Sequence, residues 1–278
     1  MTLDLATPRP APVPALLSPA QLEAFERDGY TVVRGLFGPA ELEELMREFD
    51  ALHARGEIPG CFKAAPATPG ADPLLVYPRM MHPHRVSRLA MHYLVHPKLE
   101  PILHQLFGEP PIAAQSMWYW KPPGARGQAL HQDNFYLRVH PGTCLAAWLA
   151  VDRADRENGG LFVAPGSHKL DVFCPDEADL TVSFTRHFVP VPEGLEEVPA
   201  DLEAGDVLFF GGNLIHGSQP NRSQHRFRRS FICHYVGESA KEIGRHYKPL
   251  YRFDGTEVKV DDATGAGPCG EYEPKGPH

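Results

Sequence analysis

The sequence has no long apolar run. No stretch approaches the roughly 18 consecutive apolar residues that a transmembrane helix needs. The first seventeen residues contain several Pro and Ala, but no basic segment followed by a continuous apolar stretch, as a secretory signal peptide would have. We therefore expect no membrane span, a disordered leader over residues 1–17 and a cytoplasmic location.

Cysteine is scarce. The five Cys stand at positions 61, 144, 174, 233 and 269; they form no C-x-x-C pair, and their number is odd. Neither feature is typical of a disulfide framework, in which Cys residues occur in even numbers. The sequence therefore predicts no such framework and a reducing compartment.

Basic residues are outnumbered by acidic ones. The chain has 27 Lys and Arg against 35 Asp and Glu, a net charge of −8, which opposes general affinity for nucleic acids. The basic cluster from Arg222 to Arg229 is too short to reverse that balance, and no dedicated nucleotide-binding motif indicates an acyl-CoA. We expect a small-molecule partner, no nucleic acid and no membrane, and leave the oligomeric state open.

The chain has the length and apolar content of one enzyme domain. Its 278 residues are 42% hydrophobic, and all-β barrels commonly reach about 200–250 residues as single domains. The stretch 261–278 is rich in Gly, Pro and charge, which predicts a loose surface segment. We expect one domain over residues 18–255 and a Gly/Pro-rich tail over residues 256–278.

Helices are predicted in the first part of the chain. Residues 18–21 (Ser-Pro-Ala-Gln) form a capping box with Pro at the first helical position, and the helix should end near Asp28; a strand follows over residues 30–34. Further helices are expected to begin at Pro39 and Pro97, because apolar residues recur there at helical spacing. These residues are Leu42, Leu45, Met46, Phe49 and Leu52 in the former, and Leu99, Ile102, Leu103 and Leu106 in the latter.

Strands are predicted from residue 112 onward. Short apolar runs at 112–120, 144–151, 207–210 and 231–236 are separated by connections rich in Gly and Pro, the texture of a sandwich or barrel. Helices first and strands afterwards indicate a mostly β fold with helices flanking one face.

Three residues have the character of metal ligands. His131 and Asp133 flank Gln132, and His216 follows more than eighty residues later. In an extended segment side chains at i and i+2 point the same way, so we expect His131 and Asp133 to reach one metal while Gln132 points elsewhere. Two His and one carboxylate form the facial triad of non-haem Fe(II) sites, which leaves three positions open. His216 must come from a distant strand, as in a jelly roll.

An arginine cluster follows the distal His. After His216 the chain has a polar loop, then basic residues up to Arg229, then the apolar run that begins at Phe231. An Arg that enters a buried strand suits a dicarboxylate co-substrate, because its planar guanidinium pairs with a carboxylate through two hydrogen bonds.

These motifs together resemble one family. The His-Gln-Asp triplet, the segment 158–168 (NGGLFVAPGSH) and the segment 216–228 are similar to those of the phytanoyl-CoA dioxygenase family, and the resemblance covers about residues 18–240. It implies a double-stranded β-helix, that is, a cupin-like jelly-roll core. It also implies an enzyme that uses Fe(II) with 2-oxoglutarate and O2 as co-substrates. The metal ligands would be His131, Asp133 and His216.

The resemblance places a 2-oxoglutarate-binding Arg about eleven residues after the distal His. That position is Phe227 here, so the sequence departs by one residue. Alignment from the following strand assigns the role to Arg228, which would share a strand face with Ser230, Ile232 and His234 while Arg229 points outward. Arg226 is the alternative if the extra residue forms a bulge.

Other site residues are also implied by the resemblance. Trp148, Met117 and Ser218 would line the 2-oxoglutarate pocket, and Arg79 stands near the place of a Lys that contacts a co-substrate carboxylate. Trp and Met on apolar strands are also common core residues, and a Gly-Ser pair is equally a turn. The Asn158-Gly159-Gly160 element is expected to form a turn.

Candidate substrate contacts follow from their place beside the triplet and on the preceding strand. Aromatic walls with a few polar groups suit a small or medium organic molecule. Residues 60–86 and 166–200 are long connections that could serve as lids. The candidate contacts are Gln115, Trp120, Asn134, Phe135 and Tyr136.

The reaction expected is hydroxylation of an unactivated C–H bond, with release of succinate and CO2. Halogenation in the same fold would need a small residue in place of the carboxylate ligand, and Asp133 argues against it. Desaturation and epoxidation by the same oxidant stay open. A non-catalytic cupin-like protein that binds a metal or ligand is the alternative of another class.

Overall fold

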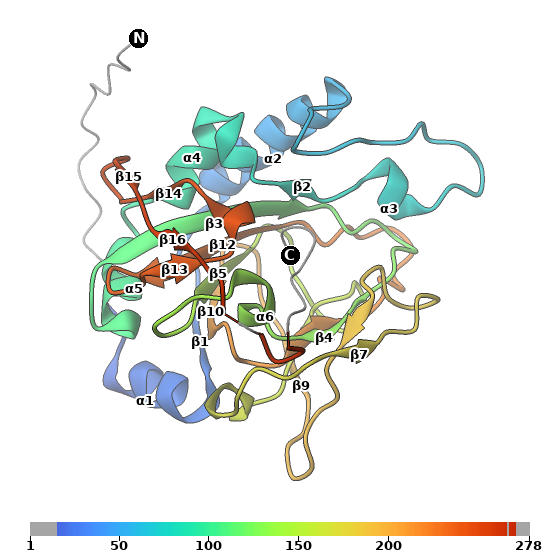
Figure 1. Cartoon of the computed structure of the whole chain (residues 1–278). Helices are drawn as coiled ribbons and strands as arrows, with labels where there is room; N and C mark the ends of the chain where they lie inside the picture. Colours follow the sequence, from blue (N-terminus) through green and yellow to red (C-terminus); the bar gives the residue numbers. More distant parts are fainter. Residues whose placement is uncertain (1–15, 266, 271–278) are drawn as a thin grey trace.

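Two β-sheets form the centre of the molecule. The computed structural model describes residues 16–265 and 267–270 (Figure 1). The larger sheet has the strand order β1-β10-β5-β12-β3-β14-β15 with β2 beside β3, and the smaller has the order β4-β11-β6-β9. The larger sheet consists of β1 (Tyr30–Val33), β2 (Met80–Met81), β3 (Pro111–Tyr119), β5 (Leu145–Ala150), β10 (Val207–Gly211), β12 (Ser230–Gly237), β14 (Leu250–Tyr251) and β15 (Glu257–Val258). The smaller sheet consists of β4 (Gln128–His131), β6 (Leu161–Val163), β9 (Val198–Ala200) and β11 (His216–Ser218).

The interior between the two sheets is one apolar cluster. Residues of the larger sheet alternate, so that Ile232 of β12 and Trp148 of β5 point inward, where they meet Val163 of the smaller sheet. Their neighbours, such as Phe231 and Leu149, point to the opposite face of the larger sheet. Two antiparallel sheets with interdigitating inner faces form the predicted jelly roll.

Helices cover the outer face of the larger sheet. They are α1 (Pro19–Asp28), α2 (Pro39–Ala54), α4 (Arg88–Leu94) and α5 (Glu100–Phe107), with α2 and α4 side by side in Figure 1. The apolar stripe of α2 is buried as predicted: Leu42, Leu45, Phe49 and Leu52 are at most 5% exposed. Met46 is partly buried against the same cluster. This second core holds the larger sheet in place behind the site.

The predicted ends of the first helix are confirmed, whereas the predicted start of the helix at Pro97 is wrong. Ser18 caps α1 with a capping box, and Gly29 ends it in the left-handed region with φ 85°. The helix expected to begin at Pro97 is α5, which begins only at Glu100, because residues 97–99 form a turn. The sequence patterns did not indicate α4, nor the short α3 (Pro73–Val76) and α6 (Asn134–Leu137).

Both ends of the domain differ from expectation. The predicted leader lies outside the described residues except for Leu16 and Leu17, and Leu17 is 5% exposed, packs into the core and donates its N–H to Gln105 Oε1 at 2.8 Å. Part of the segment after residue 256 is paired with the rest of the domain. It contributes β15 to the larger sheet and β16 (Asp261–Asp262), which pairs with β13 (Glu242–Ile243).

One disulfide joins Cys174 to Cys269, which corrects the expectation of reduced cysteines. The two residues are 95 positions apart and meet only because the C-terminal segment folds back to the connection after β6. The spacing of the Cys residues along the sequence does not indicate this disulfide. Cys61, Cys144 and Cys233 are free and buried.

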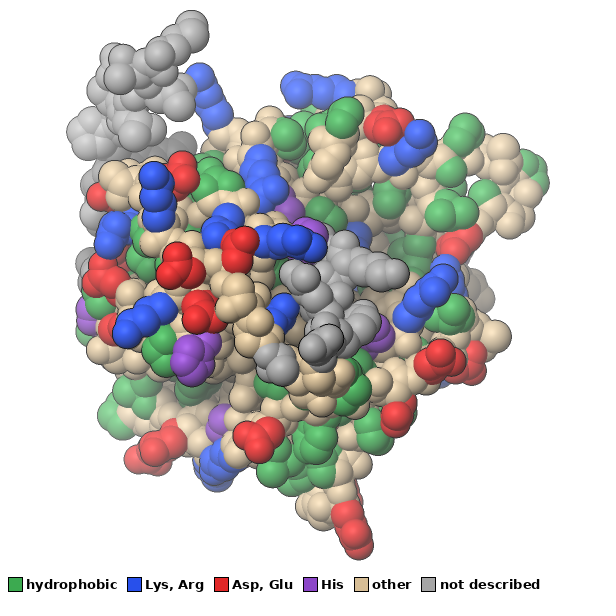
Figure 2. Space-filling view, viewed as in Figure 1, with side chains coloured by type: hydrophobic (Ala, Val, Ile, Leu, Met, Phe, Trp, Pro, Cys, Tyr) green, Lys and Arg blue, Asp and Glu red, His purple; other side chains and the backbone are tan. Residues whose placement is uncertain are grey.

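None of the helices in the described part of the chain is long and apolar enough to cross a membrane. Figure 2 shows acidic and basic side chains interspersed over the face it presents, without a large patch of one sign among the described residues there.

Phe49 should be a major contributor to stability. Its ring is fully buried and stacks on Trp118 with centroids 4.1 Å apart. Phe49→Ala should lower the free energy of unfolding by about 3–5 kcal/mol, because it leaves a cavity between α2 and the sheet. Leu75→Ala, at a side chain that is 58% exposed, is the matched control and should change stability by less than about 0.5 kcal/mol. Urea denaturation measures both, and equal effects would contradict the core assignment.

Candidate metal centre and co-substrate pocket

The pairing of β4 with β11 brings the three predicted metal ligands together. His131 is the last residue of β4, His216 is the first of β11, and the two are direct partners in the antiparallel register. Their rings lie 4.2 Å apart between centroids. Asp133 completes the group, and one ligand atom of each residue lies within 4.8 Å of the others.

The local geometry of the triplet differs from the expected extended strand. Asp133 has φ −62° and ψ −36° and is the N-cap residue of α6, so the strand ends before it. Asp133 reaches His131 by a turn and not by the alternation of a strand. Gln132 points elsewhere as expected: its amide donates to Asn213 O and Asp171 O and accepts from Phe173 N.

The ring nitrogens of both His are oriented for a metal. The Nδ1 atom of His131 lies 2.7 Å from Ala129 O, and that of His216 lies 3.0 Å from Leu214 O. These carbonyls require a proton on Nδ1, which leaves the Nε2 lone pair as the ligand. The two Nε2 atoms lie 3.5 and 3.7 Å from Asp133 Oδ1, so three donor atoms converge on one point.

The charges of the three residues suit a cation. Burial acts to raise the pKa of Asp133, but the neighbouring His216, His234 and His131 side chains lower it well below its usual range. Burial lowers the pKa of His216 to about 4, so its ring is neutral at neutral pH. One anionic carboxylate and two neutral imidazoles are the donor set that an Fe(II) facial triad requires.

His234 of β12 holds the second carboxylate oxygen. Its Nε2 donates to Asp133 Oδ2 at 2.9 Å, and its side chain is 1% exposed. Because His234 binds Oδ2 of Asp133, the other carboxylate oxygen, Oδ1, is directed to the two His ligands. Its period-2 relation to Arg228 predicts its place on the inner face, but no sequence pattern indicated a role for His234 beside the metal ligands.

Arg228 is a buried cation at the other end of the same interior. Its side chain is 3% exposed, and its guanidinium donates to Ser230 Oγ at 2.7 Å and Gly159 O at 3.2 Å. The cation lies 5.2 Å above the Trp148 ring. No carboxylate of the described residues is within salt-bridge distance of it. Burial lowers the pKa of Arg228 to about 10, which still leaves it charged at neutral pH.

The neighbouring arginines have partners of their own. Arg226 forms ion pairs with Asp155 at 2.9 Å and Glu157 at 2.6 Å, and Arg229 pairs with Asp152 at 2.7 Å. Only Arg228 of the three therefore directs an uncompensated charge inward, which favours it over Arg226 as the anion-binding residue.

The remaining residues expected around the co-substrate surround this interior. Met117 and Trp148 line the small cavity that also contains the three ligands and His234. Ser218 follows on β11, and Arg79 donates to the hydroxyl of Tyr119, another lining residue, at 3.2 Å.

The expected substrate contacts are only partly brought together. Gln115 lies on the inner face of β3, fully buried, and its amide has no hydrogen-bond partner among the described residues. Phe135 and Tyr136 lie next to His187 of β8 (His187–Phe188), whose Nδ1 is 2.8 Å from the Tyr136 hydroxyl. No sequence pattern indicated that His187 would lie near these residues.

Two of the expected contacts have partners within the protein. Trp120 points to the helix side of the sheet, where its Nε1 donates to Asp50 Oδ1 at 3.4 Å, because alternation along β3 sends it away from Met117. Asn134 uses its side-chain oxygen to accept from Val139 N, just beyond the end of α6.

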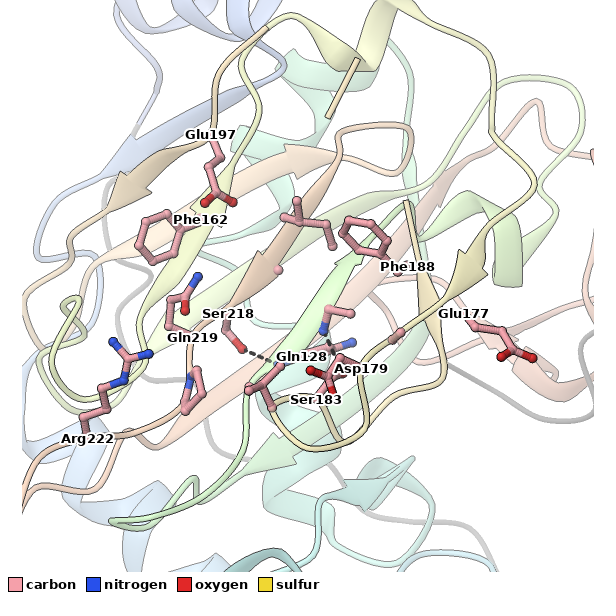
Figure 3. A pocket seen from close by; sticks show the side chains of 17 residues that line it. Gln128, Phe162, Glu177, Asp179, Ser183, Phe188, Glu197, Ser218, Gln219 and Arg222 are labelled. Atoms are coloured by element: carbon pink, nitrogen blue, oxygen red, sulfur yellow. Dashed lines mark hydrogen bonds between the residues drawn. The ribbon is translucent and has the colours of Figure 1, made fainter. Parts of the chain in front are cut away.

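A second, larger cavity adjoins the centre. It has a volume of about 490 Å³ and shares Gln128 and Gly217 with the small cavity. Figure 3 shows Phe162, Phe188 and the carboxylates of Glu177, Asp179 and Glu197 among the side chains that line it.

The connection over residues 166–200, expected as a lid, forms a wall of this cavity and is bonded along β4. Gly127 N donates to Val182 O at 2.8 Å, Gly127 O accepts from Phe184 N at 2.9 Å, and Val189 N donates to Leu130 O at 2.8 Å. Together with the Gln132 contacts, these bonds fix the connection at several points.

The fold and the site define an iron- and 2-oxoglutarate-dependent oxygenase. A family model described as phytanoyl-CoA dioxygenase (PhyH) matches residues 25–230, and the chain belongs to this family. It is thus an Fe(II)/2-oxoglutarate-dependent dioxygenase, with iron as cofactor and 2-oxoglutarate as co-substrate. This excludes the non-catalytic alternative.

Several known proteins are similar to this chain in sequence or in fold. The peroxisomal phytanoyl-CoA dioxygenase of Rattus norvegicus is 27% identical over 245 residues, 82% of this chain and 71% of that protein. Phytanoyl-CoA dioxygenase 1 of Oryza sativa subsp. japonica is 38% identical over 117 residues, 41% of each chain. The epimerase SnoN, solved with Fe3+, alpha ketoglutarate and nogalamycin RO, has a TM-score of 0.62 at 24% identity, over 92% of this chain and 94% of its own.

His234 should support metal binding without being a ligand. His234→Leu removes the donor to Asp133 Oδ2, and loss of such a supporting contact typically weakens metal affinity about 10- to 100-fold. Anaerobic titration with Co(II), followed by absorbance, measures the change. His234→Gln, whose amide nitrogen can reach the same oxygen, should retain most of the affinity. Unchanged affinity in the Leu variant would show that Asp133 needs no such support.

Proposed function

We propose that this enzyme hydroxylates an unactivated C–H bond of a small or medium organic molecule and releases succinate and CO2. One observation carries the proposal: the buried interior has an anionic donor set at one end, His131, Asp133 and His216, and the uncompensated cation of Arg228 at the other. A dicarboxylate that binds a metal at one end and an Arg at the other fits both.

The residues have separate tasks in this proposal. His131, Asp133 and His216 hold Fe(II), which supplies activation of O2 together with oxidative decarboxylation of 2-oxoglutarate. Arg228 binds the far carboxylate of 2-oxoglutarate through its planar fork, and Trp148 below it fixes the plane of that fork. Met117 and Trp148 line the space between the two ends and exclude water, which protects a reactive oxidant.

The substrate is proposed to approach from the side of α6. Phe135 and Tyr136 supply aromatic surface there, and Gln115 offers a buried amide that can hydrogen-bond to a polar substrate group. Ser218 and Arg79 belong to the surroundings of the co-substrate. The cytoplasmic location expected from composition stays a prediction, as does the absence of nucleic-acid and membrane partners.

A different reaction carried out by the same oxidant is the second candidate function. The carbocyclase SnoK has a TM-score of 0.65 at 18% identity over 81% of this chain and 86% of its own, which is a likeness of fold alone. A carbocyclase and an epimerase, SnoN, thus share this fold, so reactions other than hydroxylation occur on it. The intact Asp133 carboxylate favours hydroxylation, desaturation or epoxidation over halogenation, because no position is vacated for halide.

Turnover with labelled oxygen tests the reaction. The protein with Fe(II), ascorbate and 2-oxoglutarate should form succinate when a suitable metabolite from a library is added, and that metabolite should gain one atom of label from ¹⁸O2. Loss of two hydrogens without label would indicate desaturation and overturn hydroxylation. Asp133→Ala, which removes the anionic ligand, should abolish substrate-dependent succinate.

Arg228 and Arg226 provide a matched pair for the co-substrate. Arg228→Ala should raise the 2-oxoglutarate concentration for half-saturation about 30-fold or more, because loss of one partner of a buried charge pair costs about 2–5 kcal/mol. Arg226→Ala removes a half-exposed cation that pairs with Asp155 and Glu157 and should leave that concentration within about twofold. Binding of Co(II) alone should be equal in both variants. The reverse order of the two effects would assign the role to Arg226.

A further inference from the structure

The Cys174–Cys269 disulfide joins two segments that are both bonded to the stretch of chain carrying Asp133. Cys174 belongs to the connection after β6, and Cys269 belongs to the C-terminal segment. The stretch between them in this argument is 132–138, which runs from the residue before Asp133 to the residue that ends α6. Each of the two bridged segments is bonded to one end of this stretch.

Gln132, the residue between two of the metal ligands, makes the first attachment. Its side-chain oxygen accepts from Phe173 N at 2.8 Å, and its side-chain nitrogen donates to Asp171 O at 3.2 Å. Phe173 directly precedes Cys174 in the chain. One end of the disulfide is therefore a single residue away from a hydrogen bond to the metal-binding triplet.

The second attachment lies at the end of α6. Arg138, which ends this helix with φ 53°, donates to Gly265 O of the C-terminal segment. Val258 of the same segment packs against the apolar cluster that contains Leu137 of α6. Asp133 thus lies on a stretch that is held at both ends by segments which the disulfide links to each other.

The position of the disulfide allows reaction with external thiols. Cys174 is exposed and Cys269 is half-buried, and exposed disulfides are more readily reduced than buried ones. The other three cysteines are buried, and burial raises the pKa of Cys61 to about 11 and those of Cys144 and Cys233 further above the usual range. Buried thiols that stay protonated do not attack a disulfide, so thiol exchange is confined to this pair.

We propose that the Cys174–Cys269 disulfide is a redox switch that sets the strength of metal binding. A dithiol reductant attacks one sulfur, forms a mixed disulfide and leaves as its own cyclic disulfide. Two electrons and two protons thereby pass to the protein, which keeps two thiols. The segment of Phe173 then loses its link to the C-terminal segment, so Gln132 and the triplet are held less firmly. This inference concerns the metal centre and does not depend on which reaction the enzyme catalyses.

Anaerobic titration with Co(II), followed by absorbance, tests the switch in the whole chain. Oxidised wild type is compared with wild type that has been reduced with dithiothreitol, alkylated with iodoacetamide and desalted, because dithiothreitol itself binds Co(II). The third sample is the double variant Cys174→Ser/Cys269→Ser. The reduced protein and the double variant should each bind Co(II) about 10-fold more weakly than oxidised wild type, the lower end of the effect of losing a contact that supports a metal ligand.

Controls establish the route of the effect. Gln132→Leu removes the bonds to Phe173 and Asp171, so it should weaken Co(II) binding in the oxidised protein and make reduction nearly without further effect. Treatment of the double variant with dithiothreitol, followed by desalting, should leave its affinity unchanged. Reoxidation of reduced, unalkylated wild type with glutathione disulfide should restore tight binding.

Three results would contradict the inference or its basis. If mass spectrometry finds Cys174 and Cys269 unalkylated after dithiothreitol treatment of the folded protein, the disulfide is no switch. A lower melting temperature with unchanged Co(II) affinity, in the reduced protein and the double variant alike, would assign the disulfide a structural role alone. If oxidised wild type binds no Co(II), the metal centre itself is rejected.

Discussion

The antiparallel pairing of β4 with β11 is the constraint on which the site depends. It places His131 opposite His216, although the two are far apart in sequence, and both rings are then fixed by carbonyls two residues earlier. A slip of one residue would turn one imidazole to the outer face. Register is secured by the apolar interior, since the partners of β11 in β6 include Val163, which is fully buried. The apolar packing beside the site therefore fixes the positions of the two His side chains.

The interior separates opposite charges instead of pairing them. Asp133 and its His neighbours lie at one end and Arg228 at the other, with Met117 and Trp148 between them. Neither group neutralises the other within the protein. Such an arrangement is expensive for folding and is typical of a site that a charged ligand completes.

The sequence predicted what short-range rules determine. The capping box at Ser18, the buried stripe of α2 and the alternation that sends Arg228 inward and Arg229 outward all follow from local periodicity. The three ligands were found because their residue types are specific, although the strand geometry assumed for Asp133 was wrong. Trp120 shows the limit of such rules. It lies one residue beyond the end of β3 and continues the alternation of that strand, but the sequence does not tell which of the two alternating sets of side chains faces the helices.

The rest could not be predicted because it arises from tertiary contacts. His234 meets Asp133 across 101 residues, and Lys121 meets Ser218 across 97. Neither pair has a spacing that distinguishes it from chance. The Cys174–Cys269 bridge and the attachment of residues 256–262 likewise depend on where the chain returns after β12.

The bonds between the 166–200 connection and β4 have an entropic consequence. Backbone contacts at Gly127 and Leu130, and the amide of Gln132, hold this wall of the cavity in position without any ligand. A segment that is already ordered loses little conformational freedom when a molecule binds, so more of the contact energy appears as affinity. Gln132, the residue between two metal ligands, also bonds to this wall, so the wall is attached directly to the metal centre.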